Sequence, residues 1–145
     1  MASKDTAVGK GDAAEKSARN HLNGEGWTTI KAPRTITKIW NKTMHKWIYV
    51  PATVDYWHSF DILAVRSNEM LFLQVTDRHD LAEHKTKIEQ NFKSVIFNIP
   101  QFSVQIWLWR KVPHGSVERY EFDIVSWEYS TSLKKMVWVE RQARL

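Results

Sequence analysis

The chain contains no cysteine, only five glycines and four prolines in 145 residues, and no long apolar run. The absence of cysteine excludes disulfides and thiolate zinc sites, and the histidines lack the paired HxxxH spacing of zinc ligands. No segment approaches the roughly 18 apolar residues of a membrane span, and the N-terminal segment lacks the apolar core of a secretion signal. We therefore expect a soluble, cytoplasmic protein with no membrane partner.

Positive charge and tryptophan are what the sequence has in excess. The formal net charge is +5, the isoelectric point is about 9.5, and eight residues are tryptophan. A basic balance favours an anionic partner, most commonly nucleic acid. A large buried core is the alternative explanation for the tryptophans.

A single domain is the most economical organisation for a chain of this length, which can bury roughly 70% of its unfolded surface. Residues 1–9 are small and polar, so we expect a disordered tail there. No repeat, low-complexity tract or linker divides the rest. Residues 10–145 are therefore expected to form one domain.

The first half of the chain predicts a helix followed by strands. Ala14, Ala18 and Leu22 recur at helical spacing, and β-branched and aromatic residues dominate the segments that follow. The runs TITKIW and KWIYV suit a two-stranded ribbon. The expected elements are a helix over 12–23, a strand over 27–32, a ribbon within 33–59 and a hairpin over 60–76.

The second half predicts another helix and more strands. Asp80 and Glu83 match the D-x-x-E form of a capping box, which indicates a helix start. The expected elements are a helix over 80–92 and strands over 93–99, 103–112 and 118–127, while the tail is ambiguous between strand and helix. The order is α-β-β-β-α-β with an inserted β-ribbon, which is a mixed α/β fold.

Polar residues stand at the outer ends of the hairpin FDILAVRSNEMLFLQVT. A two-residue turn at Ser67 and Asn68 would place Asp61 opposite Gln74, with Thr76 on the same face. A three-residue turn would put Asp61 and Gln74 on opposite faces. Any site formed by these groups therefore depends on the register of the hairpin.

A further acid, Glu15, lies at the edge of the apolar face of the first helix. It falls about 60° from the centre of the stripe, which lets a carboxylate reach the rim of a sheet while keeping contact with solvent. The alternative is a solvated glutamate paired with Arg19 four residues later.

The segments GKGDAAEKSARNHLNGEGW, SFDILAV and LFLQVT, in this order and spacing, resemble the PD-(D/E)xK nuclease superfamily. Within it the chain is most similar to the archaeal-type Holliday junction resolvases. The resemblance implies a restriction-endonuclease-like central sheet flanked by helices and a homodimer that acts on branched DNA in recombination and repair. It also implies a Mg²⁺ site, in which Mn²⁺ can substitute, with Glu15, Asp61 and Gln74 as ligands and the carbonyl of Val75 completing the shell.

Two positions depart from the family pattern. Gln74 replaces an acid, although an amide oxygen still suits Mg²⁺. Thr76 replaces the catalytic lysine. Lys85 is our candidate for a migrated lysine, because it falls about 40° from Leu81, inside the apolar stripe of the second helix, whereas Lys87 faces away. Snorkelling of Lys85 from the helix edge is the alternative.

The ribbon interleaves cations with aromatic residues. Cations neutralise phosphates and aromatic rings stack on exposed bases, so we expect nucleic-acid binding here. An ordinary basic edge strand is the alternative. The candidate binding residues are Arg34, Lys38, Trp40, Lys42, Lys46 and Trp47.

Our leading hypothesis is a Mg²⁺-dependent, structure-specific DNA endonuclease that hydrolyses phosphodiesters in branched DNA. Glu15, Asp61, Gln74 and Lys85 are its expected catalytic residues. The alternatives are a nuclease-fold nucleic-acid-binding module without catalysis and a basic protein-interaction domain. The DNA structure cleaved, and DNA against RNA, stay open at this point.

Overall fold

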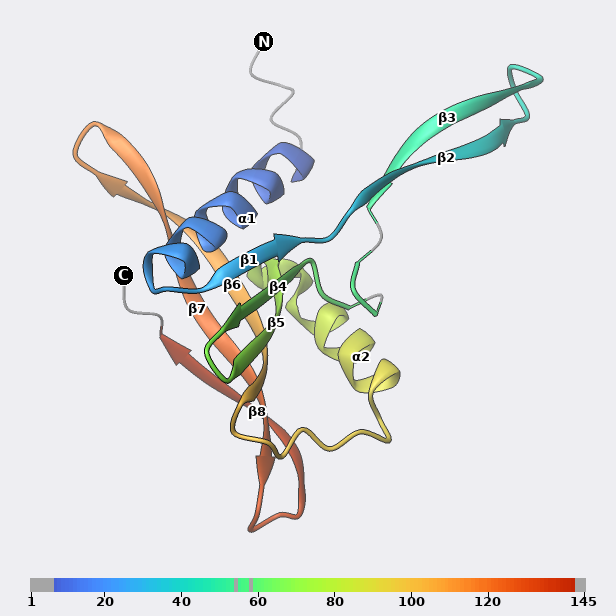
Figure 1. Cartoon of the computed structure of the whole chain (residues 1–145). Coiled ribbons are helices and arrows are strands. Elements are labelled where there is room, and N and C mark those ends of the chain that lie inside the picture. Colours follow the sequence, from blue (N-terminus) through green and yellow to red (C-terminus); the bar gives the residue numbers. More distant parts are fainter. Residues whose placement is uncertain (1–6, 54, 58, 143–145) are drawn as a thin grey trace.

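A computed structural model describes residues 7–53, 55–57 and 59–142 and shows a mixed α/β fold (Figure 1). Within these residues two helices, α1 (Ala7–Gly24) and α2 (Leu81–Asn91), flank a six-stranded sheet. None of the helices in these ranges is long and apolar enough to cross a membrane. The strands, in order across the sheet, are β1 (Thr28–Lys31), β4 (Ile62–Arg66), β5 (Glu69–Thr76), β6 (Phe102–His114), β7 (Val117–Ser130) and β8 (Lys135–Gln142).

The two remaining strands, β2 (Arg34–Asn41) and β3 (Lys46–Thr53), form a separate antiparallel hairpin that we call the ribbon. It leaves the domain between β1 and β4 and projects away from the sheet (Figure 1). The prediction of an inserted ribbon is confirmed. Its strands pair along their whole length, with Arg34 opposite Thr53 at the base and Asn41 opposite Lys46 at the tip.

The sheet is mixed because one of its neighbouring pairs is parallel. β5 and β6 run in the same direction, and α2 lies in the connection between them, as a parallel crossover requires. The pairs β1–β4, β4–β5, β6–β7 and β7–β8 are antiparallel. The central strand β5 is therefore paired on both sides.

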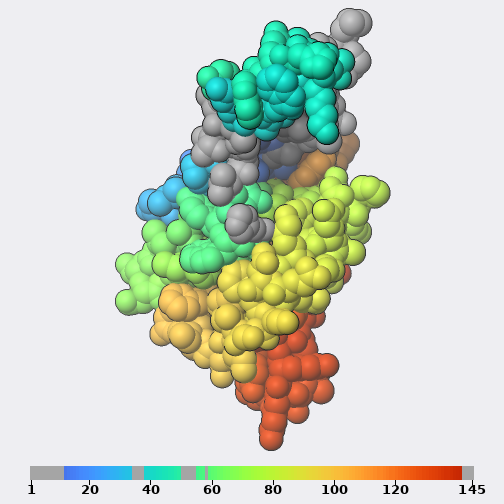
Figure 2. Space-filling view, turned by 90° about the vertical axis from the view of Figure 1, so that its right-hand side faces the viewer, coloured from blue at the N-terminus to red at the C-terminus, as the bar shows by residue number. Residues whose placement is uncertain are grey.

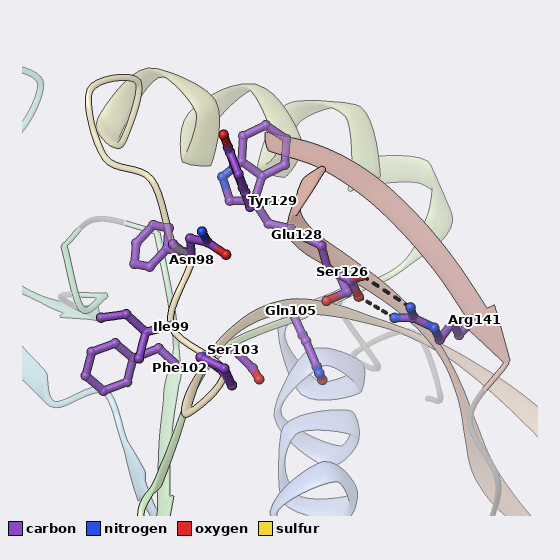
Figure 3. Close-up of a pocket in the computed structure, with 12 residues that line it drawn as sticks. Asn98, Ile99, Phe102, Ser103, Gln105, Ser126, Glu128, Tyr129 and Arg141 are labelled. Carbon is purple, nitrogen blue, oxygen red and sulfur yellow. Dashed lines mark hydrogen bonds and ion pairs between the residues drawn. The ribbon is translucent and has the colours of Figure 1, made fainter. Parts of the chain in front are cut away.

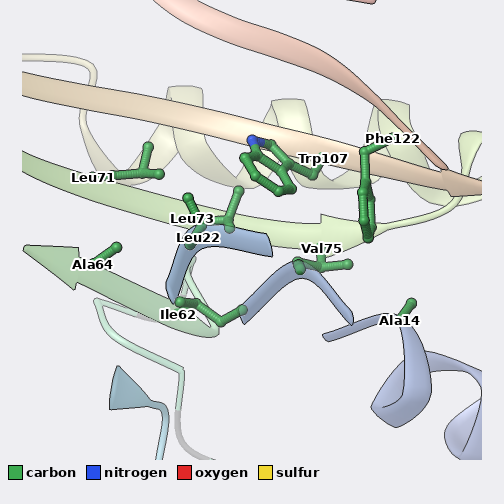
Figure 4. Close-up of a cluster of buried hydrophobic side chains, with 10 residues drawn as sticks. Ala14, Leu22, Ile62, Ala64, Leu71, Leu73, Val75, Trp107 and Phe122 are labelled. Atoms are coloured by element: carbon green, nitrogen blue, oxygen red, sulfur yellow. The ribbon is translucent and has the colours of Figure 1, made fainter. Parts of the chain in front are cut away.

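The helix α1 covers one face of the sheet. Ala14, Ala18 and Leu22 are buried against β4 and β5, which confirms the face predicted from their spacing. Two alanines on this face allow close approach of helix and sheet. Figure 4 shows the cluster, whose other buried members are Ile62, Ala64, Leu71, Leu73, Val75, Trp107 and Phe122.

The helix α2 packs over the opposite face, since the residues in its cluster alternate along the strands with those facing α1. Ile88 is fully buried there, and Leu81 and Phe92 pack at its edge, which confirms the predicted stripe. Trp127 and Trp138 pack together in the same cluster, with ring centroids 4.5 Å apart. The tryptophan-rich strands β7 and β8 thus contribute side chains to the hydrophobic core.

The β4–β5 hairpin has the register on which the proposed site depends. Arg66 pairs with Glu69 across a two-residue turn, and the side chains of these two residues form an ion pair. Asn68 adopts a φ of 61°, a left-handed conformation that asparagine tolerates well. The pairing continues to Ile62 opposite Leu73, so Asp61 follows at the end of the ladder.

α1 begins earlier than predicted, whereas α2 begins at Leu81 with Asp80 as its N-cap, as predicted. α1 includes residues 7–9, which the sequence had assigned to the tail, because Ala7 and Val8 continue the helix; residues 1–6 lie outside the described ranges. The predicted capping box was wrong. Asp77 instead caps a 3₁₀ turn (Arg78–Asp80) by accepting the N–H of Asp80 at 3.0 Å, and α2 follows directly.

Residues 93–99, predicted as a strand, form an irregular connection between α2 and β6. This apolar segment joins neither edge of the sheet, which are formed by β1 and β8. Phe97 packs against the cluster under α2. The ambiguous tail is resolved as the edge strand β8.

Substitution of Leu73 by alanine tests the core around β5. Leu73 is fully buried, so the change should lower the free energy of unfolding by about 2–5 kcal/mol. Urea denaturation followed by circular dichroism measures it. Leu133→Ala, at an exposed position, should change stability by less than about 0.5 kcal/mol, and an equal loss in both variants would contradict the assigned core.

Candidate active site

Asp61 lies at the end of the β4–β5 ladder with only 4% of its surface exposed. Its Oδ1 accepts the N–H of Val75 at 3.2 Å, and its Oδ2 accepts a hydrogen bond from the Gln74 amide at 3.2 Å. The backbone N–H of Asp61 donates to the carbonyl of Leu73 at 3.1 Å. The structure therefore brings Asp61 and Gln74 together as the two-residue turn predicts.

The buried side chain of Gln74 connects two oxygen-bearing groups. Its Nε2 donates to Asp61 Oδ2 and also to the carbonyl of Val75, at 3.3 Å. Its Oε1 is buried without a hydrogen-bond partner among the described residues. A half-turn of the amide would exchange Oε1 and Nε2. Oxygens of Gln74, Asp61 and Val75 would then converge, an arrangement that favours a shared proton or a bound cation.

Glu15 reaches this group from α1. It lies at the edge of the buried helix face, as predicted, and close enough to Asp61 for the two carboxyl groups to share a hydrogen bond. Its Oε2 lies 3.1 Å from Lys31 Nζ, an ion pair without the geometry of a hydrogen bond. The alternative pair with Arg19 is not its contact here, because Arg19 Nε donates instead to Thr29 at 3.4 Å.

The environment raises the pKa of Asp61 well above its ordinary value. Burial is the largest cause, followed by the negative charge of Glu15, the hydrogen bond with Glu15 and the charge of Asp55. The N–H of Val75 opposes these effects by stabilising the carboxylate. Two carboxyl groups this close cannot both ionise without cost, so they hold a proton or attract a cation.

The donor set fits a hard divalent cation. Two carboxylates, an amide oxygen and the carbonyl of Val75 are ligand types that Mg²⁺ accepts. Within the described ranges, Glu15 Oε2 and Gln74 Oε1 are buried without hydrogen-bond partners. Over residues 7–53, 55–57 and 59–142, no cluster of three or more His, Asp or Glu side chains is arranged to hold a metal. A metal here would therefore rely on Gln74 and the main chain as well as on Glu15 and Asp61.

Lys31, which the sequence reasoning missed, supplies positive charge to this group. It pairs with Ile62 across β1 and β4, and its Nζ lies 3.1 Å from Glu15 and 3.6 Å from Asp12. The polarity of β1 is inverted, because Lys31 is half-buried beside α1 while Ile30 is 52% exposed. The sequence alone could not reveal this inversion, because the buried face of β1 is known only once its pairing with β4 is known.

Lys85, the predicted migrated lysine, points elsewhere. Its Nζ lies 5.6 Å from the ring of Trp138, which belongs to β8 and also donates a hydrogen bond to Glu89 on α2. β8 is four strands from β4, a lateral distance of about 19 Å. The structure therefore does not bring Lys85 to Asp61. Thr76, in the position of the family lysine, is buried in β5.

Asp55 and His84 extend the polar group towards α2. Asp55 is near enough to raise the pKa of Asp61 and to act on His84. Burial lowers the pKa of His84, and the charge of Lys87 lowers it further, so the imidazole is neutral near pH 7. Its buried Nδ1 has no hydrogen-bond partner in the described part of the chain. The sequence reasoning did not select Asp55 because it lies outside any regular element.

An open groove of ≈ 490 Å³ adjoins Lys31 on the outer side of α1. Positively charged side chains dominate its lining, which suits a phosphate backbone. The lining residues are Asp12, Lys16, Arg19, Asn20, Asn23 and Lys31. A cavity of ≈ 410 Å³ on another part of the molecule, in which Arg141 pairs with Glu128, is lined by none of Glu15, Asp55 and Asp61, which we call the acidic group (Figure 3).

The predicted nucleic-acid-binding residues lie on the ribbon. Lys38, Trp40, Lys42, Lys46 and Trp47 are all exposed. Arg34 belongs to β2, but its side chain lies outside the described part of the structure. The ribbon begins and ends beside the acidic group, since Lys31 precedes it and Asp55 follows it. Spatial proximity of the ribbon base to Asp61 is thus established.

No family model, curated protein or solved structure matches this chain.

The metal-free stability should depend on Asp61 in a definite direction. Its pKa is raised in the folded state, so the folded protein retains this proton better than the unfolded chain does. The resulting stabilisation is present at low pH and is lost as the pH rises above about 4 and through the folded-state pKa. Asp61→Asn should therefore gain stability over the wild type as pH rises, measured by thermal unfolding in a chelator.

Mg²⁺ or Mn²⁺ should raise the unfolding temperature of the wild type. At a hundred times its dissociation constant, a cation that binds only the folded state stabilises it by about 2.7 kcal/mol. Asp61→Asn and Glu15→Gln should lose this response, whereas Glu118→Gln, at an exposed acid, should keep it. Equal stabilisation of all four proteins would argue against a metal site at Asp61.

Proposed function

We propose that this protein has a restriction-endonuclease-like fold and is a Mg²⁺-dependent endonuclease that acts on branched DNA, similar to the archaeal-type Holliday junction resolvases. The observation that carries the proposal is the buried Asp61, which meets the half-buried Glu15 at the end of the β4–β5 hairpin, beside Gln74 and Lys31. A buried acid whose pKa is strongly raised and that meets a specific charge partner is typical of a catalytic site.

Different residues of the chain would have different roles in hydrolysis. Asp61, Glu15, Gln74 and the carbonyl of Val75 would hold the metal, which when bound polarises the phosphate and lowers the pKa of water. Lys31 places positive charge at the same point, where negative charge builds up on the phosphate. Lys16 and Arg19 line the adjoining groove and would hold the flanking backbone. We also propose a homodimer, because symmetrical cutting of two strands needs two such sites.

A cleavage assay tests the proposal most directly. Labelled four-way junctions, single strands and linear duplexes are incubated with Mg²⁺, with Mn²⁺ or with a chelator. We expect metal-dependent cutting of the junction, reduced about 10³-fold or more in Asp61→Asn because a principal ligand charge is lost. Metal-independent cutting, or cutting that survives the substitution, would overturn the assignment of the site.

The source of the catalytic positive charge can be tested with paired variants. Lys31→Gln should slow turnover about 10²-fold, whereas Lys31→Arg should retain most activity, since it keeps the charge. Lys85→Gln serves as the matched control and should stay within about twofold of the wild type, because Lys85 contacts Trp138. Junction affinity and unfolding temperature are measured alongside. A larger loss in Lys85→Gln would restore Lys85 as the catalytic lysine.

A second function is favoured by one observation, namely the buried Thr76 where the family has a lysine. In that case the protein is a nuclease-fold module that binds nucleic acid without cutting it. Tight junction binding with no product under any metal condition would support this alternative.

A further inference from the structure

The outer part of the ribbon, residues 38–49, projects away from the rest of the protein (Figure 1). The ribbon forms its own two-stranded sheet and stands away from the six-stranded sheet (Figure 1). In the space-filling view it forms a separate lobe at the top of the molecule (Figure 2). A two-stranded hairpin is marginally stable alone. Aromatic residues that project from such an arm are therefore not explained by packing in the core.

The pairing register concentrates aromatic rings on one face of the ribbon. Trp40 lies opposite Trp47, and Lys38 lies opposite Tyr49, so these four side chains share a face. Trp40 is 47% exposed, Trp47 55% and Tyr49 71%. Trp40 and Trp47 meet edge to face at 5.5 Å, and Lys38 Nζ lies 5.3 Å from the Trp47 ring. We call these four residues the aromatic face.

Charge restricts what can cover this face. Residues 34–53 contain four Lys or Arg and no Asp or Glu, so the ribbon carries +4 of the net +5 of the chain. Two copies of such a ribbon repel one another, and a negatively charged partner is attracted. A nucleic acid combines that charge with flat rings that stack on tryptophan and tyrosine.

The composition of the aromatic face favours unpaired over paired bases. A β-ribbon can enter the major groove of a duplex, but base edges there are read mainly by Arg, Lys, Asn and Gln side chains. The aromatic face presents three rings and a single residue of that kind, Lys38, whose Nζ lies 5.3 Å from the Trp47 ring. Ring faces become available for stacking on side chains when bases leave the duplex.

We propose that the aromatic face of the ribbon binds unpaired bases, so that the preferred ligand is a nucleic acid with a single-stranded segment. Tyr49, which the sequence reasoning did not select, is part of this surface. The binding itself is independent of the proposed hydrolysis. Its relation to cleavage rests on the proposed function.

The length of the ribbon sets where those bases lie relative to a cut. Lys31, at the acidic group, precedes Trp40 by 40 − 31 = 9 residues, which span about 30 Å in a strand. At about 3.4 Å per nucleotide in a duplex, this reach corresponds to about nine nucleotides. The unpaired bases therefore lie within that distance of the cleaved phosphate.

Binding is tested with the full chain in a chelator, where no cleavage occurs. A labelled single strand and a blunt-ended duplex with the same number of phosphates are titrated by fluorescence anisotropy. We expect the single strand to bind at least tenfold more tightly. The double variant Trp40→Ala/Trp47→Ala should bind it about 10- to 100-fold more weakly, because two stacking contacts are lost. Binding of the blunt-ended duplex should change little.

Matched variants separate stacking from loss of the ribbon itself. Ile39→Ala changes an exposed residue on the opposite face and should leave the preference intact, as should Trp47→Phe, which keeps a ring. Lys38→Gln should lower the affinity for both nucleic acids to the same extent, because a charge that neutralises phosphate is lost. Equal affinity of the wild type for both ligands would overturn the proposal. So would a wild-type dimer that becomes monomeric in the double variant, since a second copy would then cover the face.

The binding and cleavage assays test the two proposals separately, so that either proposal can fail while the other holds. A single-strand preference in the chelator, with no Mg²⁺-dependent product, supports the aromatic face and rejects the nuclease. Junction cutting that is lost in Asp61→Asn, without a single-strand preference in the chelator, supports the nuclease and rejects the aromatic face.

Discussion

Burial of the Asp61 carboxyl group is the constraint on which the proposed site depends. The N–H of Val75 and the amide of Gln74 both donate to it, yet its pKa stays well above the ordinary range because burial and Glu15 outweigh those donors. An asparagine of the same shape would avoid most of this cost. A fold that keeps an acid under such conditions is typical of a functional site.

A second unfavourable placement, after the burial of Asp61, lies in the adjacent strand β1. In β1 the apolar Ile30 faces solvent, while Lys31 faces α1 and Glu15. Simple amphipathic packing would place them the other way round. The inversion places Lys31 where its Nζ forms ion pairs with Glu15 and Asp12 on α1. Three elements that are distant in sequence thus converge on one charge cluster.

The domain and the ribbon differ in their physical character. The acidic group rests on paired strands and two packed faces, which hold its side chains firmly. Two hydrogen bonds tie the base of the ribbon to the sheet: Ala32 donates its N–H to the carbonyl of Asp61 at 2.8 Å, and the Tyr56 hydroxyl donates to the carbonyl of Lys31 at 3.4 Å. An arm fixed in this way positions a ligand relative to Asp61 while leaving its outer face open.

Local patterns in the sequence determined the mixed α/β class, the stripe of α1, the ribbon and the register that places Asp61 beside Gln74. These features follow from side-chain periodicity and turn length, which act over a few residues. Tertiary structure alone decided that Lys31 reaches Glu15, that Lys85 turns to Trp138 and that residues 93–99 form no strand. Those outcomes depend on which strands become neighbours, because a side chain's partner across a sheet or helix face comes from distant parts of the chain.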